Sequence, residues 1–468
     1  MKYAAFKSRL VILGFGSIGQ GSLPLILRHL DISPEQILIL SANDAGREIA
    51  ESYGVKMVIE HITKDNLRTV LEPLLSEGDF LLNLSVDVSS KSLFTFAHER
   101  GALYLDTCIE PWPGGYTDPK HSPSQRSNYA LREQALELKT EYAGGPTAVI
   151  AHGANPGLVS HFVKVALLNI ARDTGLDTPM PTTRTAWANL ARALDIKVIH
   201  IAERDTQVAR EPKQPGEFVN TWSIDGFVGE GCQPAELGWG THEKQLPADG
   251  HHHEFGCDSA IYLDRPGAGT KVRTWTPLEG PFHGFLVTHN ESISIADYFS
   301  VHNGRGVLYR PTVHYAYHPC DDAVLSLHEL AGKNWEPQSK HRLMMDEISE
   351  GIDELGVLLL GHARGAYWYG SRLSIEQTRA LAPHNNATSL QVTAPVLAGM
   401  VWALENPCAG IVEADEIDHV RIMDIAGPYL GDLVGEYSDW TPLKDRSPLF
   451  PEPKDPSSPW QFVNFRVT

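Results

Sequence analysis

The sequence of 468 residues has few cysteines and no long hydrophobic run, and each shortage excludes a class of protein. The five cysteines are scattered without a C-x-x-C pair, which argues against a structural zinc site and against a disulfide framework. The longest apolar runs, such as 356–360, are too short to span a membrane, and the N-terminus has no signal-peptide pattern. We therefore expect a cytoplasmic protein with reduced thiols and no membrane partner.

Positive charge is also scarce, since 39 Lys and Arg stand against 58 Asp and Glu and give a formal net charge of −19. The chain has no basic stripe of the kind that binds a phosphate backbone, so nucleic acid is excluded as a partner. The adjacent histidines His251, His252 and His253 have no fixed coordination geometry, so we expect them to be exposed and expect no metal site. The acidic balance would suit a cationic ligand, although many soluble proteins are acidic for colloidal reasons.

The stretch 9–21, RLVILGFGSIGQG, is the clearest feature that is present. An apolar strand-like run leads into Gly14, Gly16 and Gly19, which have the G-x-G-x-x-G spacing, and an amphipathic helical pattern follows. This context predicts a dinucleotide site in which Gly14, Phe15, Gly16, Ser17, Ile18 and Gly19 contact the cofactor. The alternative is an ordinary glycine turn inside a core.

Strand-like and helix-like segments alternate from this loop to about residue 155. The alternation predicts an α/β unit, a Rossmann-type doubly wound parallel sheet over residues 1–155. Asp44 follows the second predicted strand, slightly later than the usual spacing of about 20 residues for the acidic group that binds the ribose. Asp44 favours NAD over NADP as the cofactor, whereas Arg47 leaves NADP possible.

Polar residues follow the later strands of this predicted sheet, where ligands of open parallel sheets bind. The residues expected to contact the cofactor there are Asn83, Ser85, Val86, Thr107 and Pro156. Capping of the next helix is the structural alternative for Asp87. Asn155 and Pro156 could equally be an ordinary helix start.

From about residue 180 the pattern changes to short β-rich runs separated by Gly, Pro and Asp. We expect a large α+β second domain with a mixed sheet over residues 156–440, which binds substrate and forms dimer contacts. The segment 389–404 is apolar nearly all round, which predicts a buried helix, and this helix could return to the first domain. Residues 441–468 contain six prolines and predict an extended C-terminal arm: Pro442, Pro448, Pro451, Pro453, Pro456 and Pro459.

Carboxylates and an aromatic ring stand out in the predicted turns of the second domain, and they suit an amine substrate. The residues are Glu203, Trp222, Glu230, His289, Asp353 and Glu354. The sequence shows no arginine set for an α-keto acid carboxylate. Each residue also has a structural explanation: Glu203 as a solvated strand end, Trp222 as a core side chain and His289 as a loop histidine. The pattern alone does not choose between these readings.

Six segments together resemble the bacterial homospermidine synthases, and the resemblance covers most of the chain. They are VILGFGSIGQG, NLSVDVSS, LDTCIEPW, AHGANPGLVSHFVK, NTWSIDGFVGEG and VTHNESISIADYF. The glycine loop and HGANPG are shared with the wider saccharopine-dehydrogenase-like group. The resemblance implies an NAD-dependent, redox-neutral homodimer that joins two putrescines, or related diamines, into sym-homospermidine and releases ammonia.

The resemblance also implies roles at the reacting centre. NAD would take a hydride from the carbon beside one amine, and the resulting imine would lose ammonia, directly or through 4-aminobutanal. A second putrescine would condense with that carbon, and the retained NADH would return the hydride. Asn155, Glu203 and His289 would surround the reacting amine, with Glu203 as proton acceptor. The ring of Trp222 would attract ammonium and iminium groups.

Further acidic residues would bind the ends of the substrate under the same resemblance. Glu110 and Asp87 would hold terminal ammonium groups, and Glu230 would add charge near Trp222. Asp353 or Glu354 would lie at the outer mouth and guide the diamine in. The alternative within the same group is a saccharopine- or carboxynorspermidine-type NAD(P)-dependent dehydrogenase.

Overall fold

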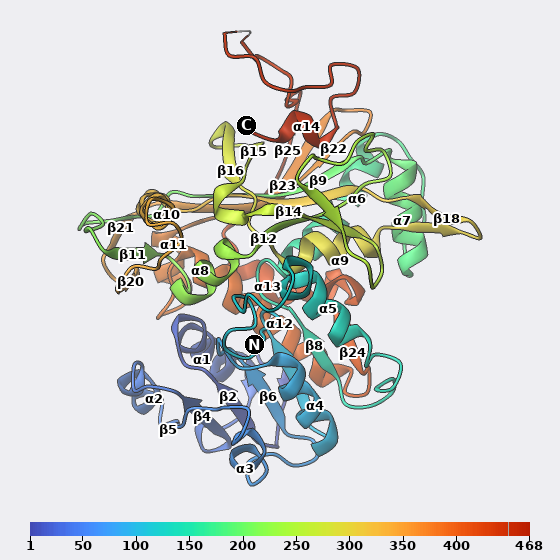
Figure 1. The fold of residues 1–468 in the computed structure, drawn as a ribbon. Helices are drawn as coiled ribbons and strands as arrows, with labels where there is room; N and C mark the ends of the chain where they lie inside the picture. The colour runs from blue at the N-terminus through green and yellow to red at the C-terminus, as the bar shows by residue number, and fades with distance from the viewer. Residues whose placement is uncertain (448) are drawn as a thin grey trace.

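Two sheets organise the computed structural model, which describes residues 1–447 and 449–468 (Figure 1). The first is a seven-stranded sheet in which every pair of neighbouring strands is parallel. Its strands, in spatial order, are β24 (Ile411–Glu413), β8 (Ala148–Ile150), β7 (Leu103–Asp106), β6 (Phe80–Asn83), β2 (Leu10–Leu13), β4 (Ile37–Ser41) and β5 (Lys56–Ile59). This sheet confirms the predicted Rossmann-type α/β unit.

The strands of the first sheet are apolar because helices cover both of its faces. β2 (LVIL) and β6 (FLLN) are buried along their whole length. The helices in this part of the chain are α1 (Ser17–His29), α2 (Arg47–Ser52), α3 (Leu67–Leu71), α4 (Ser90–Arg100) and α5 (Asn128–Leu136). The carboxyl ends of the strands point toward the second unit, so the loops that follow them lie between the two sheets (Figure 1).

The second unit is built on a ten-stranded mixed sheet, as the sequence predicts. β9 and β19 are parallel neighbours at its centre, and the other pairings are antiparallel. The strands, in order, are β13 (Gly250–His252), β14 (Ala260–Pro266), β12 (Pro234–Gly238), β19 (Thr312–His318), β9 (Val198–Asp205), β22 (Ile352–Leu360), β23 (Ala366–Ser374) and β25 (Asp432–Ser438), with β15 (Lys271–Thr276) and β16 (Gly280–Phe285) beside β19.

Helices and short strands complete the second unit. α6 (Leu158–Asp173) packs on β22 and β23, and α9 (Asn290–Tyr298) packs on β12 and β19. The other helices are α7 (Arg184–Ala193), α8 (Ile224–Cys232), α10 (Asp321–Gly332), α11 (Ile375–Leu381), α13 (His419–Ala426) and α14 (Phe462–Phe465). Three small two-stranded pairings join β10 (Val208–Ala209) to β21 (Ile348–Glu350), β11 (Glu217–Asn220) to β20 (Lys340–Leu343), and β17 (Val301–Asn303) to β18 (Gly306–Tyr309).

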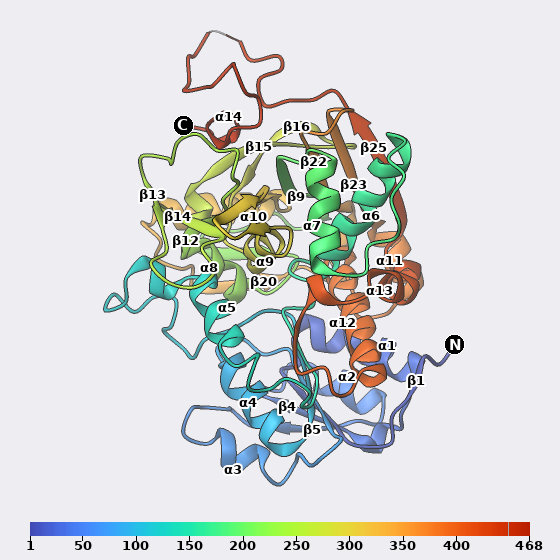
Figure 2. The same cartoon turned by 90° about the vertical axis from the view of Figure 1, so that its right-hand side faces the viewer.

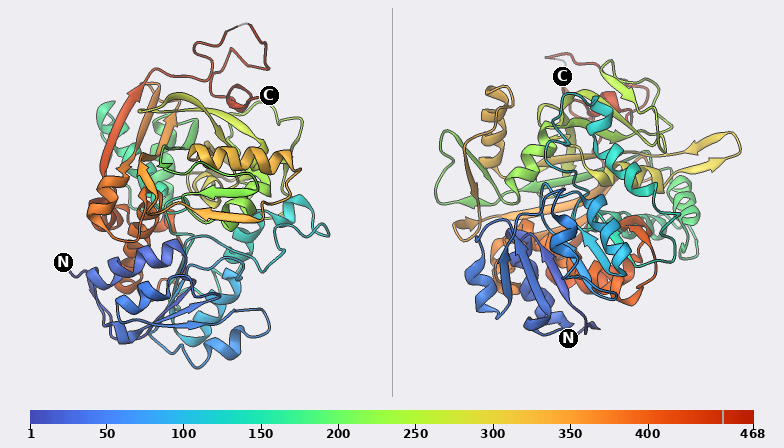
Figure 3. Two further views of the ribbon diagram at one scale, coloured as in Figure 1. Left: turned by 90° about the vertical axis from the view of Figure 1, so that its left-hand side faces the viewer. Right: turned by 60° about the horizontal axis from the view of Figure 1, so that its bottom comes forward.

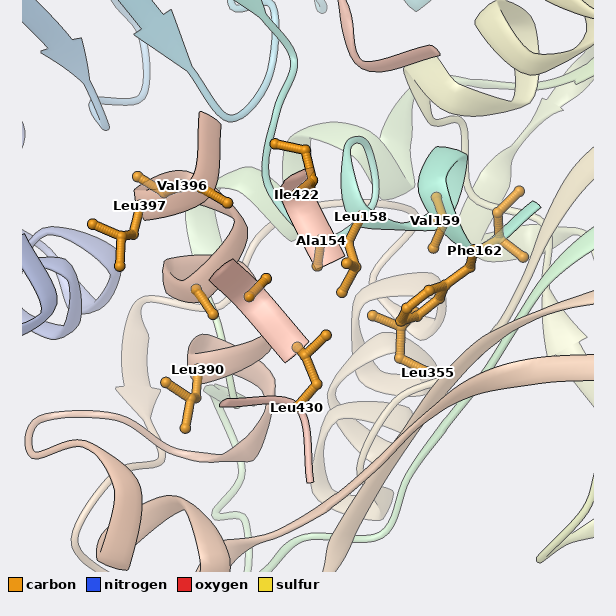
Figure 4. Packing of buried hydrophobic residues seen from close by; sticks show 14 of the residues in the cluster. Ala154, Leu158, Val159, Phe162, Leu355, Leu390, Val396, Leu397, Ile422 and Leu430 are labelled. Carbon is orange, nitrogen blue, oxygen red and sulfur yellow. The ribbon is translucent and has the colours of Figure 1, made fainter. Parts of the chain in front are cut away.

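Helix α12 (Ala387–Glu405) lies between the two units and packs against α1, α13 and β7. In the part of the chain that the structure describes it is the one helix long and apolar enough to span a membrane, but 83% of its most apolar window is buried inside the protein. Its side chains Leu390, Val396 and Leu397 belong to a core that also contains Leu158 and Leu355 of the second unit (Figure 4). The continuous core fixes the two units against each other, and β24 follows α12 back into the first sheet.

Several local predictions were wrong. Asn155 and Pro156 do not start a helix, because α6 begins at Leu158 and the two residues lie in the loop after β8, joined by a cis peptide bond. His253 is buried rather than exposed, since its ring stacks on Tyr129 and bonds the hydroxyl of Ser124. A loop histidine flanked by polar residues gives no sequence signal that an aromatic ring covers it.

The C-terminal arm lies at the end of the molecule opposite the Rossmann unit (Figures 2 and 3). Pro448, one of its six prolines, lies outside the described residues. The arm ends in α14, which packs against β15 of the large sheet and buries Phe462 and Phe465 there. The arm is therefore anchored by its last residues.

Candidate active site

A cavity of about 510 Å³ lies between the carboxyl ends of the parallel strands and the second unit. The loops after β2, β4, β6, β7 and β8 form one side of it. The other side comes from β9, β19, β20 and β22, from α8, and from the N-terminal ends of α9 and α12. Elements from nearly the whole chain therefore meet at one place.

The predicted glycine loop forms one end of the cavity, and the surroundings of its three glycines differ. A Cβ on Gly14 would lie 2.5 Å from the carbonyl oxygen of Leu84, and a Cβ on Gly19 would lie 2.8 Å from that of Gly14. A Cβ on Gly16 would meet nothing within 4 Å. Gly14 and Gly19 are thus needed for the turn and for close packing, whereas Gly16 leaves open space at the N-terminus of α1, where a pyrophosphate binds in this fold.

Most of the predicted cofactor contacts line the same cavity. Gly14, Phe15, Gly16, Ser17, Ile18, Ser85, Val86, Thr107 and Pro156 all do so. Gly19 does not line it, because it packs beneath Gly14. Asn83 is buried at the end of β6, where its amide donates to the hydroxyl of Tyr104 and its carbonyl accepts from Ser85. Asn83 therefore orients Ser85 and does not face the cavity.

Asp44 is exposed and does not line the cavity, which corrects its predicted place beside the ribose. β4 ends at Ser41, and the residues of the following loop that line the cavity are Ala42, Asn43 and Ala45. Asp44 lies between Asn43 and Ala45, and its side chain is exposed on the outside of this turn.

Glu203 lies on β9 and is only 3% exposed, so the interpretation as a solvated strand end is wrong. The hydroxyl of Tyr315 donates to its carboxylate, and so does the side-chain amide of Asn155, at 3.3 Å. Burial raises the pKa of Glu203 to about 8, the hydrogen bond from Tyr315 opposes the increase, and the nearby Asp205 adds to it. The charge of His289 also lowers the pKa of Glu203 without cancelling the effect of burial. A buried carboxylate with a raised pKa and neutral hydrogen-bond donors is poised to accept a proton or a cation.

Trp222 lies in the turn before α8 and lines the cavity. Its indole N–H donates to the hydroxyl of Tyr317 at 3.0 Å, and its ring packs against Phe227. The ring is half-buried, so core packing and a cavity-facing surface are both present. The bond to Tyr317 holds the indole in one orientation.

His289 precedes α9 and faces two carboxylates. Its Nε2 donates to Glu230 at 2.9 Å, and its Nδ1 lies 3.3 Å from Glu291. Burial would lower the pKa of His289, but the two carboxylates raise it well above its usual value. His289 and Glu230 line the cavity, whereas Glu291 is fully buried behind them.

Glu110 and Asp87 differ in their surroundings. Glu110 lines the cavity and is 7% exposed, and burial together with the charge of Glu230 raises its pKa to about 8. The thiol of Cys108 donates to it at 3.4 Å. Asp87 is exposed and lies outside the lining residues, next to Val86 and Val88, which belong to them. Asp87 therefore stands at the rim.

Asp353 and Glu354 are not at the mouth of the cavity, which corrects their predicted location. Both lie within β22, between β9 and β23, and are at most 1% exposed. Asp353 accepts from the hydroxyl of Thr388 at 2.5 Å, and Glu354 on the opposite face accepts from Arg372 at 3.0 Å. Two adjacent acidic residues suggested a turn because the sequence does not show these buried partners.

Several other residues line the cavity that the sequence does not single out. They include Tyr315, Cys108, Thr388 and Gln391. Tyr315 lies on β19 in the run TVHYAYH, whose alternating aromatic and small residues are a strand signal that could have been used. Thr388 and Gln391 lie on the buried helix α12, where nothing local distinguishes a cavity-facing residue from a packed one.

The cavity lining is rich in acidic side chains. Five acidic side chains line the cavity: Glu60, Glu110, Glu203, Asp225 and Glu230. Within residues 1–447 and 449–468, no lysine or arginine lines it. The site can therefore hold a substrate with several positive charges beside a dinucleotide, but it offers no strong partner for a substrate carboxylate.

Comparison with known proteins agrees with this architecture. Residues 10–149 match the family described as saccharopine dehydrogenase NADP binding domain, and residues 153–439 match the saccharopine dehydrogenase C-terminal domain. A saccharopine dehydrogenase from Saccharomyces cerevisiae shares the fold, with a TM-score of 0.54 at 12% identity over 92% of this chain and 100% of that one. The fold and the site thus define an enzyme of the saccharopine-dehydrogenase-like class.

Nearer relatives narrow the assignment. Homospermidine synthase from Blastochloris viridis is 56% identical over 99% of this chain and 98% of its own length, and that from Mesorhizobium japonicum is 52% identical over 99% and 97%. A crystal structure of homospermidine synthase from Legionella pneumophila in complex with NAD has a TM-score of 0.93 at 53% identity, over 99% of this chain and 98% of that one. The chain belongs to the homospermidine synthase family.

Proposed function

We propose that this enzyme condenses two putrescines into sym-homospermidine, with release of ammonia and without net oxidation or reduction. The observation that carries the proposal is the cavity lining, which contains five acidic side chains and, among the described residues, no lysine or arginine. Saccharopine-type substrates carry carboxylates and would need basic partners, whereas diamines need carboxylates. The family assignment and the name of the relatives support the same substrate class.

The cofactor that fits the glycine loop is NAD. The open space over Gly16 at the start of α1 suits a pyrophosphate. The loop after β4 contributes no basic side chain to the cavity, so a 2′-phosphate of NADP would lack a partner there, and the relative from Legionella pneumophila was solved with NAD. When bound, NAD supplies a hydride acceptor for the carbon beside an amine and a hydride donor later in the same cycle.

The protein's own residues bind the substrate and manage its protons. Glu203 accepts a proton from the reacting amine, because its raised pKa makes it basic enough and Tyr315 and Asn155 hold it in place. The face of Trp222 stabilises the ammonium and iminium groups. Glu110 and Glu230 bind the charged amines, and Asp87 attracts them from the rim. We further propose a cytoplasmic homodimer, as the family resemblance implies.

A stoichiometry measurement tests the proposal. With putrescine and a catalytic amount of NAD, the enzyme should form homospermidine and ammonia in equal amounts while the absorbance of NADH stays constant. Conversion of the added NAD to NADH without homospermidine would instead indicate a net dehydrogenase, as in the saccharopine- or carboxynorspermidine-type alternative, and would overturn the proposal.

A further inference from the structure

Glu291 is a buried carboxylate that touches the site without lining it. It lies in the first turn of α9, and its side chain is 0% exposed. Its only ion-pair partner among the described residues is His289, whose Nδ1 lies 3.3 Å from it, and neither of its carboxylate oxygens has a hydrogen-bond partner there. An ionised carboxylate in such a place is stable only with a positive partner.

The geometry around His289 identifies that partner. Its Nε2 faces the carboxylate of Glu230 at 2.9 Å and its Nδ1 faces the carboxylate of Glu291 at 3.3 Å. A neutral imidazole has one donor nitrogen and one acceptor nitrogen, so it would direct a lone pair at one of the two carboxylates. Only the imidazolium places a positive charge within ion-pair distance of both carboxylates.

We infer that Glu291 is a positioning residue that keeps His289 protonated, so that His289 is the acid which expels ammonia during the condensation. The inference rests on the proposed function. It assigns opposite proton roles to two residues on the same side of the cavity: Glu203, which accepts hydrogen bonds from Tyr315 and Asn155, accepts a proton, and His289, which lies between two carboxylates, donates one.

The proton is needed at one step. After the second putrescine adds to the imine, one carbon carries both the primary amino group and the new secondary nitrogen. His289 gives its Nε2 proton to the primary nitrogen, the bond from carbon to that nitrogen breaks, and its electron pair leaves with ammonia. The lone pair of the secondary nitrogen then forms the C=N bond of an iminium ion. The positive charge passes from imidazolium to iminium, so charge and atoms balance.

Other groups facing His289 set the pH at which this acid works. They are Glu230 on α8, Glu291 on α9, Glu203 on β9, and Tyr315 on β19, whose ring centre is 4.5 Å from that of the imidazole. Glu230 is partly open to the cavity and is free to pair with an incoming amine, whereas Glu291 is not. Glu291 is therefore the carboxylate that holds the charge of His289 when substrate engages Glu230.

Glu291→Gln tests the inference because the amide keeps the shape and one acceptor oxygen but removes the charge. His289 should lose its proton at lower pH, by about one pH unit or more, as measured by NMR of the histidine-labelled enzyme without cofactor. Its signal is assigned by its absence from His289→Asn. The alkaline limb of kcat should move in the same direction, while NADH formation in a single turnover keeps its wild-type rate, because oxidation precedes the step that needs the acid.

The control is Glu243→Gln, which removes another buried carboxylate that accepts from Thr312 at 2.7 Å and lies outside the cavity. It should change neither the titration of His289 nor the pH profile. A folded Glu291→Gln enzyme with both readouts unchanged would refute the inference, and so would a wild-type His289 that is already neutral at pH 8, which can be measured even if the variant does not fold. If the wild type formed no homospermidine, the proposed function would fail instead, and the titration would still decide whether Glu291 holds the charge of His289.

Discussion

Backbone atoms form much of one side of the cavity, and side chains form the other. On the Rossmann side the glycine loop forms its surface from backbone, within one continuous stretch of chain. On the other side, charged and aromatic side chains come from β9, β19, α8 and α9. Cofactor binding therefore depends on the small size of glycine, which leaves the backbone accessible. Substrate binding depends on buried charged side chains.

The difference also separates a general dinucleotide-binding side from a side whose charge selects the substrate. A glycine loop binds any dinucleotide of its kind. Buried carboxylates are costly unless a cation pairs with them, so a cavity lined by acids selects a polycation. Substitutions on the two sides should therefore separate cofactor binding from substrate chemistry.

Glu203→Gln should have the largest effect on the substrate side. Loss of a general base lowers the rate by about 10²–10⁴-fold, so amine oxidation should nearly stop at neutral pH. NAD affinity, measured by fluorescence titration, should stay at the wild-type value because Glu203 belongs to the other side of the cavity. Full activity in a folded variant would remove Glu203 as the proton acceptor.

Trp222→Ala should have the next largest effect. Loss of a desolvated cation–π interaction of about 2 kcal/mol corresponds to roughly 30-fold in turnover. Trp222→Phe keeps an aromatic face but loses the bond to Tyr317, so it should recover most of the activity. If Trp222→Ala lost its cooperative thermal unfolding, or if the Phe variant were as poor as the Ala variant, the role of the ring as a cation binder would be wrong.

The glycine side can be tested with a matched pair. Gly14→Ala should destabilise the fold, because φ at this position is +88° and the new Cβ would lie 2.5 Å from a backbone oxygen; a strained position of this kind costs about 1–3 kcal/mol. Gly16→Ala should leave the Tm unchanged and weaken NAD binding, since its Cβ meets only open space in the protein. Equal losses of stability in the two variants would contradict the distinction.

Proton release is the smallest expected signal. The pKa values of Glu203 and Glu110 are each raised to about 8, so both carboxyl groups are mostly protonated at pH 7. A diamine favours their ionised forms, so its binding should release protons at pH 7, and the release should fall as the pH rises toward 9. Calorimetry in two buffers with different ionisation enthalpies measures this. Identical heats in both buffers at pH 7 would show that the carboxyl groups are already ionised.

The sequence predicts the Rossmann side of the cavity better than the side formed by the second unit. The Rossmann unit and its glycine loop are local patterns, and both the fold and most of the cavity-lining residues there could be predicted. The location of Asp44 was predicted wrongly because neighbouring side chains in a turn face different directions, so a difference of one position decides whether a side chain faces the cavity. In the second unit, Glu203, Trp222 and His289 were selected by family resemblance, since their burial comes from strands distant in sequence.

Two kinds of residue escaped prediction for a physical reason. Tyr315 and Glu291 act through partners on other elements, Glu203 and His289, and no spacing in the sequence records those pairs. Asp353 was placed at the mouth by the family resemblance, whereas it is buried within β22 and accepts a hydrogen bond from Thr388 on α12. Long-range partners, not local patterns, decide these positions.

Deuterium labelling tests whether the hydride taken from one substrate returns within the same catalytic cycle. Putrescine deuterated at both carbons beside nitrogen is converted in the presence of excess unlabelled NADH, and the mass of the product is measured by mass spectrometry. If the hydride returns, the homospermidine keeps all the deuterium of both substrates. Loss of one deuterium from most of the product, replaced by hydrogen from the added NADH, would show that the cofactor leaves before the reduction and would rule out a retained cofactor.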